Sequence, residues 1–346
     1  MTQRTRTRFA FGLLLAALWI VGLEVAARTY WWLDKDVDPF AFDGLIRAFY
    51  PELRDAKQSR TNDQRYDLLL LGASVLNFAS RSITERLERE LERPVRVHNI
   101  ALPSHSTLDS LYKYQSIPDD RRFDLVVVYH GINDVRANNV PAEFFQADYS
   151  HYSWYAAVNA LFEHPEHRFV NFPYTLRVLS LSVTELIGLR LVVPQHVPRD
   201  EWLEFGAEVK TSAPFRSNLE GILELSRERG ERLAIMSFAT FVPPDYSEKK
   251  FKAGELAYTP TERASPIEIW GRAEHVLAGV AAHNEVIREV VAAAPDVLFI
   301  DQENLIPKDG MYFVDVCHFS EEGLEVFADH LVTAVFSGPG IVRPEP

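Results

Sequence analysis

The sequence is poor in cysteine: Cys317 is the single one among 346 residues. An intrachain disulfide is therefore excluded, and so is a zinc site built from several thiolates. A disulfide framework would have indicated an oxidising compartment, so cysteine content does not tell where this protein resides.

Basic residues are also scarce. Lys and Arg number 36 against 49 Asp and Glu, which gives a net charge of −13. An acidic chain repels nucleic-acid phosphates, and the sequence has no basic stripe to offset this, so we expect no nucleic acid as a partner. Internal repeats and low-complexity tracts are missing too. With 47% hydrophobic residues, the composition is that of a folded globular protein with one large domain or a domain with a sizeable insertion.

The N-terminal apolar run, Phe9 to Leu23, is short for a membrane span, which needs ~20 residues. Three arginines, Arg4, Arg6 and Arg8, precede it. One interpretation is a signal peptide, with small residues for cleavage at Val25-Ala26-Ala27. Another is a buried N-terminal helix of a cytosolic protein, which the three arginines before the apolar run disfavour.

A third interpretation, which we favour, is a membrane anchor from Phe9 to Leu33. Glu24 and Arg28 are four residues apart, so they can pair on one face of a helix. The aromatic residues that follow, Tyr30, Trp31 and Trp32, suit a belt at the membrane interface and have no purpose in a cleaved peptide. The arginines keep the N-terminus cytoplasmic, so everything beyond Leu33 is expected outside the cytoplasm, in the periplasm of a Gram-negative cell.

From Tyr66 onward, short apolar runs alternate with helical patterns. The runs predict five strands, at 66–71, 95–99, 125–129, 233–238 and 297–300. Helices are predicted between them and at the end, one from about Pro266 to Ala294 and the last from about Ser320 to Phe336 with Ser320 as its N-cap. This alternation predicts an α/β fold with a parallel sheet covered on both faces, whose site lies beyond the carboxyl ends of the strands.

Other segments do not follow the alternation. The expected organisation is a cytoplasmic tip and anchor at 1–33, a linker or cap at 34–65, a domain at 66–338 and a tail at 339–346. Residues 140–215 are long, aromatic and interrupted by prolines, and we interpret them as an inserted helical cap. A further irregular stretch, 239–265, is expected to form a loop over the site.

Two strand ends and a segment near the C-terminus carry residues that are suited to catalysis. Gly72-Ala73-Ser74 follows the first strand, and it places Ser74 at a helix N-terminus, where free N–H groups favour a developing negative charge. Gly131-Ile132-Asn133-Asp134 follows the third strand, where the Asn133 amide can donate to an oxyanion. Near the C-terminus, Asp315 precedes His318 by three residues, so the carboxylate can orient the imidazole as a base for serine. A serine, an oxyanion donor and an oriented histidine are the parts that acyl transfer needs.

These blocks resemble those of the GDSL/SGNH hydrolases. The family's Gly-Asp-Ser block is similar to Gly72-Ala73-Ser74, its Gly-x-Asn-Asp block to 131–134, and its Asp-x-x-His block to 315–318. The resemblance spans roughly Tyr66 to Phe336. It implies a three-layer α/β/α sandwich with a five-stranded parallel sheet of flavodoxin-like type, and hydrolysis of an ester with no metal or cofactor.

The chain departs from the family pattern at two positions. Ala73 replaces the Asp of the first block, which removes a supporting hydrogen bond but not the nucleophile. Ser104 stands where the family has a glycine whose N–H joins the oxyanion hole. Serine also has that N–H, although a glycine conformation is less accessible to it.

Simpler roles exist for several of these residues. Ser74 can be a helix cap, and Cys317 is a small buried hydrophobe rather than a nucleophile. The histidines His151, His164, His167 and His196 lack the pattern of a metal site, and Pro165 interrupts the helix that their spacing would need.

The expected activity is therefore that of a serine esterase. Ser74, His318 and Asp315 would act by acyl transfer, and the N–H groups of Ser74 and Ser104 with the Asn133 side chain would form the oxyanion hole. The substrate is an acyl ester, with O-acetyl groups of an envelope glycan as one candidate. Two alternatives stay open: an O-acyltransferase of exported polysaccharide, and a degraded enzyme that binds glycan or acts as an envelope scaffold.

Overall fold

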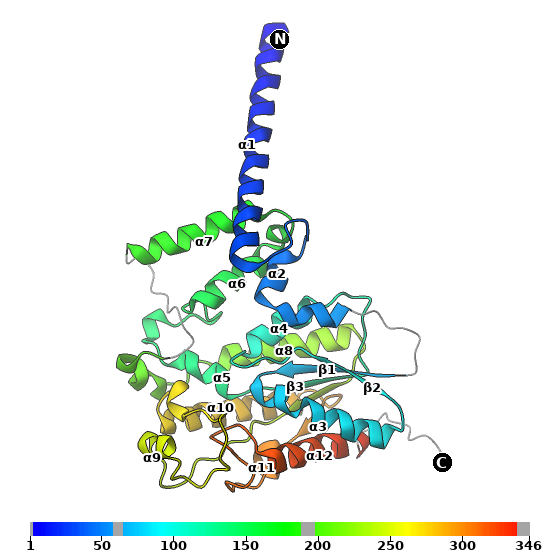
Figure 1. Cartoon of the computed structure of the whole chain (residues 1–346), viewed down its shortest axis with the longest axis vertical. Helices are drawn as coiled ribbons and strands as arrows, with labels where there is room; N and C mark the ends of the chain where they lie inside the picture. Colours follow the sequence, from blue (N-terminus) through cyan, green and yellow to red (C-terminus); the bar gives the residue numbers. More distant parts are fainter. Residues whose placement is uncertain (1–2, 58–64, 188–197, 338–346) are drawn as a thin grey trace. The chain divides into compact units, whose positions relative to one another are not determined.

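The computed structural model describes residues 3–57, 65–187 and 198–337 (Figure 1). The chain forms two compact units. The N-terminal unit comprises Met1–Arg54 and Ser150–Pro194, and the sheet unit comprises Asp55–Tyr149 and Gln195–Pro346. Residues 150–194 of the stretch interpreted as an insertion thus belong to the N-terminal unit, and residues 195–215 to the sheet unit.

The sheet has five parallel strands in the order β2-β1-β3-β4-β5. The strands are β1 Tyr66–Gly72, β2 Val95–Asn99, β3 Leu125–Tyr129, β4 Leu233–Met236 and β5 Leu298–Ile300. Their order is that of flavodoxin-like doubly wound sheets, in which sites lie where the winding reverses, between β1 and β3. Gly72 pairs with Tyr129, so these two strands end level with each other.

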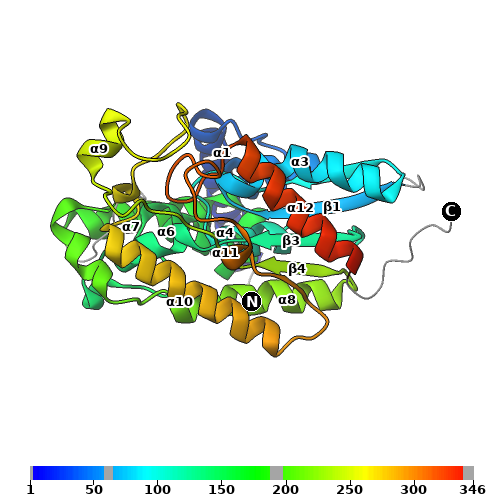
Figure 2. The ribbon, with the colours of Figure 1, turned by 90° about the horizontal axis from the view of Figure 1, so that it is seen from below.

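Helices cover both faces of the sheet, and the predicted three-layer α/β/α architecture is confirmed. On one face α3 packs against α12, and on the other α8 packs against both α4 and α10. Figure 2 shows α3 and α12 on one side of the strands and α8 and α10 on the other. Their bounds are α3 Ser74–Leu91, α4 Thr107–Gln115, α8 Ser212–Glu228, α10 Ala273–Ala292 and α12 Glu321–Ser337.

The helices follow the apolar periodicity of the sequence. In α3, Ile83, Leu87 and Leu91 are buried on one face, as their spacing of four predicts. Ser320 caps α12, because its hydroxyl accepts a hydrogen bond from the Gly323 N–H at 3.1 Å. Replacing a fully buried side chain such as Ile83 by alanine is expected to cost about 2–5 kcal/mol.

Element boundaries differ from prediction mainly before α10. The helical stretch expected from Pro266 onward begins only at Ala273. A short 3-10 turn, Ile267–Ile269, comes first, and Gly271 then adopts a φ of +142° that breaks the helix. The other short elements of the sheet unit are α5 Ile132–Val135, η2 Arg136–Asn138, η3 Ala142–Phe144, η5 Asp200–Ala207, α9 Glu248–Ala253 and α11 Gln302–Leu305, while η1 Pro51–Lys57 spans the division between the units.

The N-terminal unit is helical. It contains α1 Gln3–Lys35, α2 Gly44–Phe49, α6 Ser153–Glu163, η4 Pro165–Arg168 and α7 Asn171–Leu186. The predicted helix from Phe9 to Leu33 is part of the single, unbroken α1. This helix is long and apolar enough to cross a membrane, and none of its most apolar window is buried.

The prediction of an aromatic belt at the membrane interface is wrong for Trp31, near the end of α1. Its side chain is only 3% exposed. The indole Nε1 donates to Thr175 Oγ1 at 2.9 Å, and the ring lies 5.1 Å from that of Tyr174. Tyr30 and Trp32 are exposed. Trp31 is buried because it lies on the side of α1 that packs against α7.

Candidate active site

Ser74 is the first residue of α3, directly after β1. A Cβ on Gly72 would lie 2.9 Å from Leu76 and 3.0 Å from the Tyr129 carbonyl oxygen, so the strand-to-helix turn requires glycine here. Ala73 is the N-cap and has no side chain that could accept a hydrogen bond from the first turn. The N–H groups at the start of α3 therefore remain available to a ligand, and the helix dipole favours a negative charge there.

The structure brings Ser74, His318 and Asp315 together, although Ser74 is 244 residues from His318 in the chain. Ser74 Oγ lies 2.7 Å from His318 Nε2. On the other side of the ring, His318 Nδ1 lies 2.7 Å from Asp315 Oδ2. Asp315 is fully buried and His318 nearly so, while Ser74 is half-buried. An imidazole that donates from Nδ1 to the carboxylate has Nε2 free to accept the serine proton.

Both carboxylate oxygens of Asp315 accept hydrogen bonds. Oδ1 accepts hydrogen bonds from the backbone N–H groups of Cys317 and His318, at 2.9 and 2.8 Å. Oδ2 also accepts from the Ser265 N–H at 2.7 Å. The stretch 239–265, expected as a loop over the site, is thus tied to the Asp315 carboxylate at its end. Four donors in all fix the orientation of Asp315 and, through it, that of His318.

Cys317 lies between the two residues in sequence, but its thiol is buried, with Sγ 3.7 Å from His318 Nδ1. Burial, with the nearby Asp315 carboxylate, raises the pKa of Cys317 well above its usual value. Since the thiolate is the nucleophilic form, this environment leaves the thiol unreactive.

Asn133 comes from the short helix α5 after β3. A Cβ on Gly131 would lie 2.5 Å from the Phe238 side chain, so this approach also requires glycine. Asn133 Nδ2 donates to the His105 carbonyl oxygen at 3.0 Å. That contact uses one of the two amide hydrogens, which leaves the second for another acceptor.

Ser104 adopts a φ of +70°, in the left-handed region that serine rarely enters. Serine thus takes here a conformation that glycine adopts without strain. Within the described residues, the Ser104 N–H makes no hydrogen bond. Strained backbone of this kind persists only where the surroundings enforce it.

Two residues that the sequence did not point to hold this region. Arg136 Nη2 donates to the Ser104 carbonyl oxygen at 2.8 Å and to Asn133 Oδ1 at 2.7 Å. Trp270 Nε1 donates to the same Asn133 oxygen at 2.8 Å. With two donors on Oδ1, the amide can only be oriented with Nδ2 on the opposite side. Arg136 and Trp270 thus set the direction in which Asn133 donates.

Asp134 stabilises the neighbouring loop. Its carboxylate accepts from the Thr107 N–H and hydroxyl and from the Tyr149 hydroxyl. Burial raises the pKa of Asp134 to about 6 against the opposing effect of these hydrogen bonds. Because Thr107 is the first residue of α4, Asp134 holds the start of that helix next to the Ser104 loop.

A buried histidine supports the Gly131 turn. His283 Nδ1 lies 2.8 Å from the Gly131 carbonyl oxygen, and Nε2 lies 2.8 Å from Thr211 Oγ1. The ring stacks on Phe215 with 4.2 Å between centroids. Burial lowers the pKa of His283 to about 4, so it is neutral at physiological pH.

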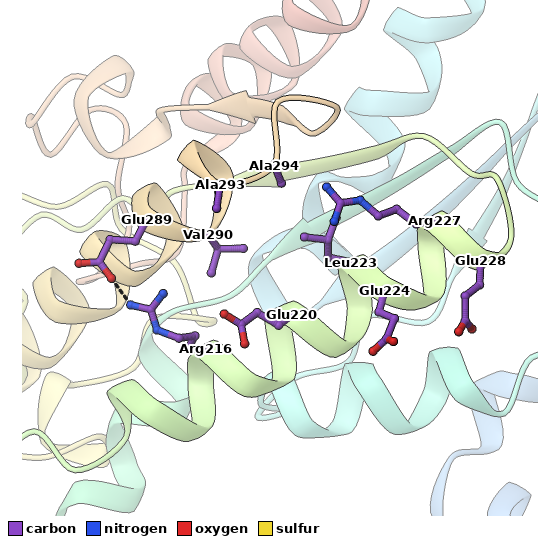
Figure 3. A pocket seen from close by; sticks show the side chains of 10 residues that line it. All are labelled: Arg216, Glu220, Leu223, Glu224, Arg227, Glu228, Glu289, Val290, Ala293 and Ala294. Carbon is purple, nitrogen blue, oxygen red and sulfur yellow. Dashed lines mark hydrogen bonds and ion pairs between the residues drawn. The ribbon is translucent and has the colours of Figure 1, made fainter.

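Two hollows on the described surface differ in the residues that line them. A small one adjoins Ser74 and is lined by residues 73–75 and 129–133 with Phe238. Figure 3 shows a larger groove between α8 and α10. The ten residues that line the groove include no serine, cysteine or histidine, and Arg216 forms an ion pair with Glu289 there. The groove therefore offers no chemistry for acyl transfer.

A group of potential metal ligands lies in the N-terminal unit. His164, Glu166 and His167 offer ligand atoms within 4.8 Å of one another. His164 Nδ1 pairs with the Glu166 carboxylate, and His167 Nδ1 lies 3.3 Å from the Ala160 carbonyl oxygen. His196, considered with them from the sequence, lies outside the described residues. This group shares no residue with the Ser74 site, which belongs to the sheet unit.

No family model matches the chain, and no curated protein matches it in sequence. Among solved structures, a GDSL-like lipase from Bacteroides thetaiotaomicron is similar with a TM-score of 0.44 at 13% identity, over 86% of this chain and 98% of that one. A lipase/acylhydrolase from Enterococcus faecalis is similar with a TM-score of 0.41 at 15% identity, over 80% of this chain and 100% of that one. An acetyl xylan esterase is similar with a TM-score of 0.41 at 12% identity, over 78% of this chain and 99% of that one. The name of the first of these, a GDSL-like lipase, is that of the family that the three sequence blocks resemble.

Proposed function

We propose that the chain is a serine esterase in which Ser74 is the nucleophile, His318 the base and Asp315 the residue that orients the base. The observation that carries the proposal is the pair of 2.7 Å contacts that joins Ser74 Oγ, the two nitrogens of His318 and Asp315 Oδ2. Neither contact alone would distinguish a nucleophile from a helix cap. Together they are the arrangement that transfers a proton from serine.

In the acylation step, Ser74 Oγ attacks the carbonyl carbon of the ester, and His318 Nε2 takes the hydroxyl proton. The new C–O bond forms as the carbonyl electron pair moves onto its oxygen. When the tetrahedral intermediate collapses, the bond to the alcohol breaks, and His318 returns the proton to the leaving oxygen. Asp315 stabilises the imidazolium that exists between these two transfers.

The oxyanion would be held by the N–H groups of Ser74 and Ser104 and by Asn133 Nδ2. The free Ser104 N–H, its enforced φ and the fixed direction of the Asn133 amide support this assignment. The start of α3 adds the favourable end of a helix dipole. Losing one donor of such a hole typically costs ~10²–10³ in rate.

In the second step, a water molecule gives a proton to His318 and attacks the acyl carbon. The bond from that carbon to Ser74 Oγ then breaks, His318 returns the proton to Oγ, and the acid is released. An O-acyltransferase would use a sugar hydroxyl in place of water, with the same residues. O-acetyl groups on an envelope glycan are the substrate that we propose, since the site would then act on material outside the membrane. A degraded, glycan-binding protein is the alternative, and the intact hydrogen-bond chain argues against it.

We also propose that α1 is a retained membrane anchor with a cytoplasmic N-terminus. Its apolar window is fully exposed, and Arg4, Arg6 and Arg8 precede it. Cleavage of a signal peptide near Ala27 would remove Glu24, whose carboxylate accepts hydrogen bonds from the N–H groups of Asn171 and Phe172. Because Glu24 is bonded into the folded unit, α1 is better explained as a permanent part of the protein.

Labelling with a fluorophosphonate probe tests the nucleophile. The full chain in detergent micelles should react at Ser74, and both Ser74→Ala and His318→Ala should lose the label. Cys317→Ala serves as the matched control, because it lies beside His318 and should keep the label. A folded wild-type protein that does not react would contradict the esterase and favour the glycan-binding alternative.

A further inference from the structure

An apolar stripe runs along the exposed side of α7 in the N-terminal unit. It consists of Leu176, Leu179, Val183 and Leu186, all more than half exposed. Their spacing of three and four residues puts them on one face of the helix. A contiguous exposed row of large apolar side chains is uncommon on a soluble surface and indicates a binding partner.

The stripe is distinct from the face by which α7 packs into its unit. Tyr174 is fully buried, and its hydroxyl donates to the Ala157 carbonyl oxygen in α6 at 3.1 Å. Val178 and Leu181 follow Tyr174 on the same, partly buried face. At 3.6 residues per turn, this face is nearly opposite the stripe. Therefore the stripe points away from α6.

The start of α7 is fixed to the C-terminal half of α1. The Glu24 carboxylate accepts from the N–H groups of Asn171 at 2.8 Å and Phe172 at 3.1 Å, at the start of α7. Arg28 pairs with Glu24 at 2.6 Å and also donates to the carbonyl oxygen of Phe169. In Figure 1, α7 runs crosswise to α1, and α6 lies on the side away from the N-terminal end of α1. The stripe therefore faces the side toward which α1 projects.

Two exposed phenylalanines belong to a loop that is bonded to α1. Arg28 Nη1 donates to the Pro39 carbonyl oxygen at 2.6 Å, which ties the loop carrying Phe40 and Phe42 to α1. Phe40 and Phe42 are exposed, and the Phe42 ring lies 5.8 Å from that of Phe169, two residues before the start of α7. Thus exposed apolar side chains lie near the start of α7 as well as along it.

The length of α1 indicates what covers these side chains. Its uncharged run, Phe9 to Leu23, extends about 22 Å at 1.5 Å per residue. The hydrocarbon core of a bilayer is ~30 Å thick, so roughly 8 Å remains to be filled by apolar groups of the unit itself. Amphipathic helices at an interface bury their apolar face by ~5–10 Å, which matches the missing depth.

We infer that α7 lies flat in the headgroup region of the bilayer that α1 crosses, with the stripe against the acyl chains. The inference rests on the proposed anchor and goes beyond it, because it gives the protein a second lipid contact. The Glu24–Arg28 pair then lies at the hydrocarbon boundary, where both charges are compensated by each other and by the backbone groups they bind. Two attachments would hold the N-terminal unit in a fixed orientation on the membrane.

Depth-dependent fluorescence quenching tests this inference with the full chain. Single cysteines would be introduced by Val183→Cys or Leu179→Cys in the stripe, by Arg177→Cys on the polar flank, and by Leu18→Cys in α1. Each variant would be labelled with an environment-sensitive dye and reconstituted in phosphatidylcholine liposomes containing lipids with shallow or deep nitroxide quenchers. Cys317 is buried, and labelled wild-type protein gives its background.

The inference predicts that shallow quenchers reduce the fluorescence at positions 183 and 179 at least twice as strongly as at position 177, and that deep quenchers act on position 18. Equal, weak quenching at all three α7 positions with strong quenching at position 18 would overturn the inference and leave the anchor intact. Weak quenching at position 18 as well would overturn the anchor. Fluorophosphonate labelling of the same samples reports separately on Ser74.

Discussion

Arg136 Nη2 lies 2.7 Å from Asn133 Oδ1, and the same nitrogen donates to the Ser104 carbonyl oxygen at 2.8 Å. One guanidinium group thus joins two segments that are about thirty positions apart in the sequence and that each supply a proposed oxyanion donor. Arg136 is nearly fully buried, as is Trp270, the second donor to Asn133. The donors are held in place before any substrate arrives, which is the condition for electrostatic stabilisation of a transition state.

Trp270→Phe is predicted to lower kcat by on the order of 10-fold with little change in KM. The substitution keeps the aromatic packing but removes the N–H that donates to Asn133. Its effect should be smaller than the ~10²–10³ loss expected for Asn133→Ala, which removes the donor itself. Steady-state hydrolysis of p-nitrophenyl acetate measures both constants, and the urea midpoint of unfolding serves as the control for stability. An unchanged kcat would show that Asn133 does not depend on Trp270 for its orientation.

Ser104 is predicted to support catalysis through its backbone N–H rather than through its hydroxyl. Ser104→Gly keeps the N–H and accepts a φ of +70° without strain, so activity should be retained within about two- to threefold. Ser104→Pro removes the N–H and fixes φ near −65°, so kcat should fall by ~10² or more. A Gly variant as inactive as the Pro variant would mean that the hydroxyl is the functional group.

Asp315→Asn is predicted to lower kcat by ~10⁴ while the protein stays folded. The amide oxygen can still accept the backbone N–H groups of Cys317 and His318, but it no longer stabilises the imidazolium and favours the wrong tautomer. The measurement is kcat together with fluorophosphonate labelling, which should slow in parallel. A loss of less than tenfold would indicate that His318 is oriented by other contacts.

His283 is predicted to make stability fall as the pH is lowered from 7 to 5. Its pKa is near 4 in the folded protein, whereas it is ~6.5 in the unfolded chain, so acid favours the unfolded state. The contribution of this one group over that range is about 2 kcal/mol. His130, with a pKa lowered to about 3 by burial, acts in the same direction.

His283→Asn removes the titrating group while an amide can still donate to the Gly131 carbonyl oxygen. The variant should therefore lose about 2 kcal/mol less between pH 7 and pH 5 than wild type does. Urea unfolding at both pH values measures the difference. The same pH dependence in both proteins would mean that His283 is not kept neutral by the fold.

Much of the sheet unit could be predicted because its strands and helices follow from residue patterns within short stretches of the sequence. The bounds of β2 and β3 match the prediction to the residue. β3 is apolar and buried at every position, as expected for a strand covered on both faces. Ser74, Asn133, Asp315 and His318 follow strand ends or precede a helix, where the topology of a parallel sheet gathers side chains at one edge. Their proximity is what the structure adds, and their catalytic roles stay a proposal.

Other features were not predictable in the same way. Trp270 follows an irregular stretch, and nothing in its neighbourhood relates it to Asn133 in a distant segment. Arg136 had a usable signal, because it is three residues after Asn133, within one helical turn. Trp31 was misplaced because periodicity shows that a residue is apolar but not whether protein or lipid covers it.

The most direct test is to trap the acyl-enzyme. Wild-type protein turning over an acetyl ester would be quenched in acid, digested and examined by mass spectrometry. We expect one acetyl group on the peptide that contains Ser74, and none on the corresponding peptide of Ser74→Ala. Turnover with the acetyl group on another residue, such as Cys317, or with no acylated peptide at all, would contradict the proposal that Ser74 is the nucleophile.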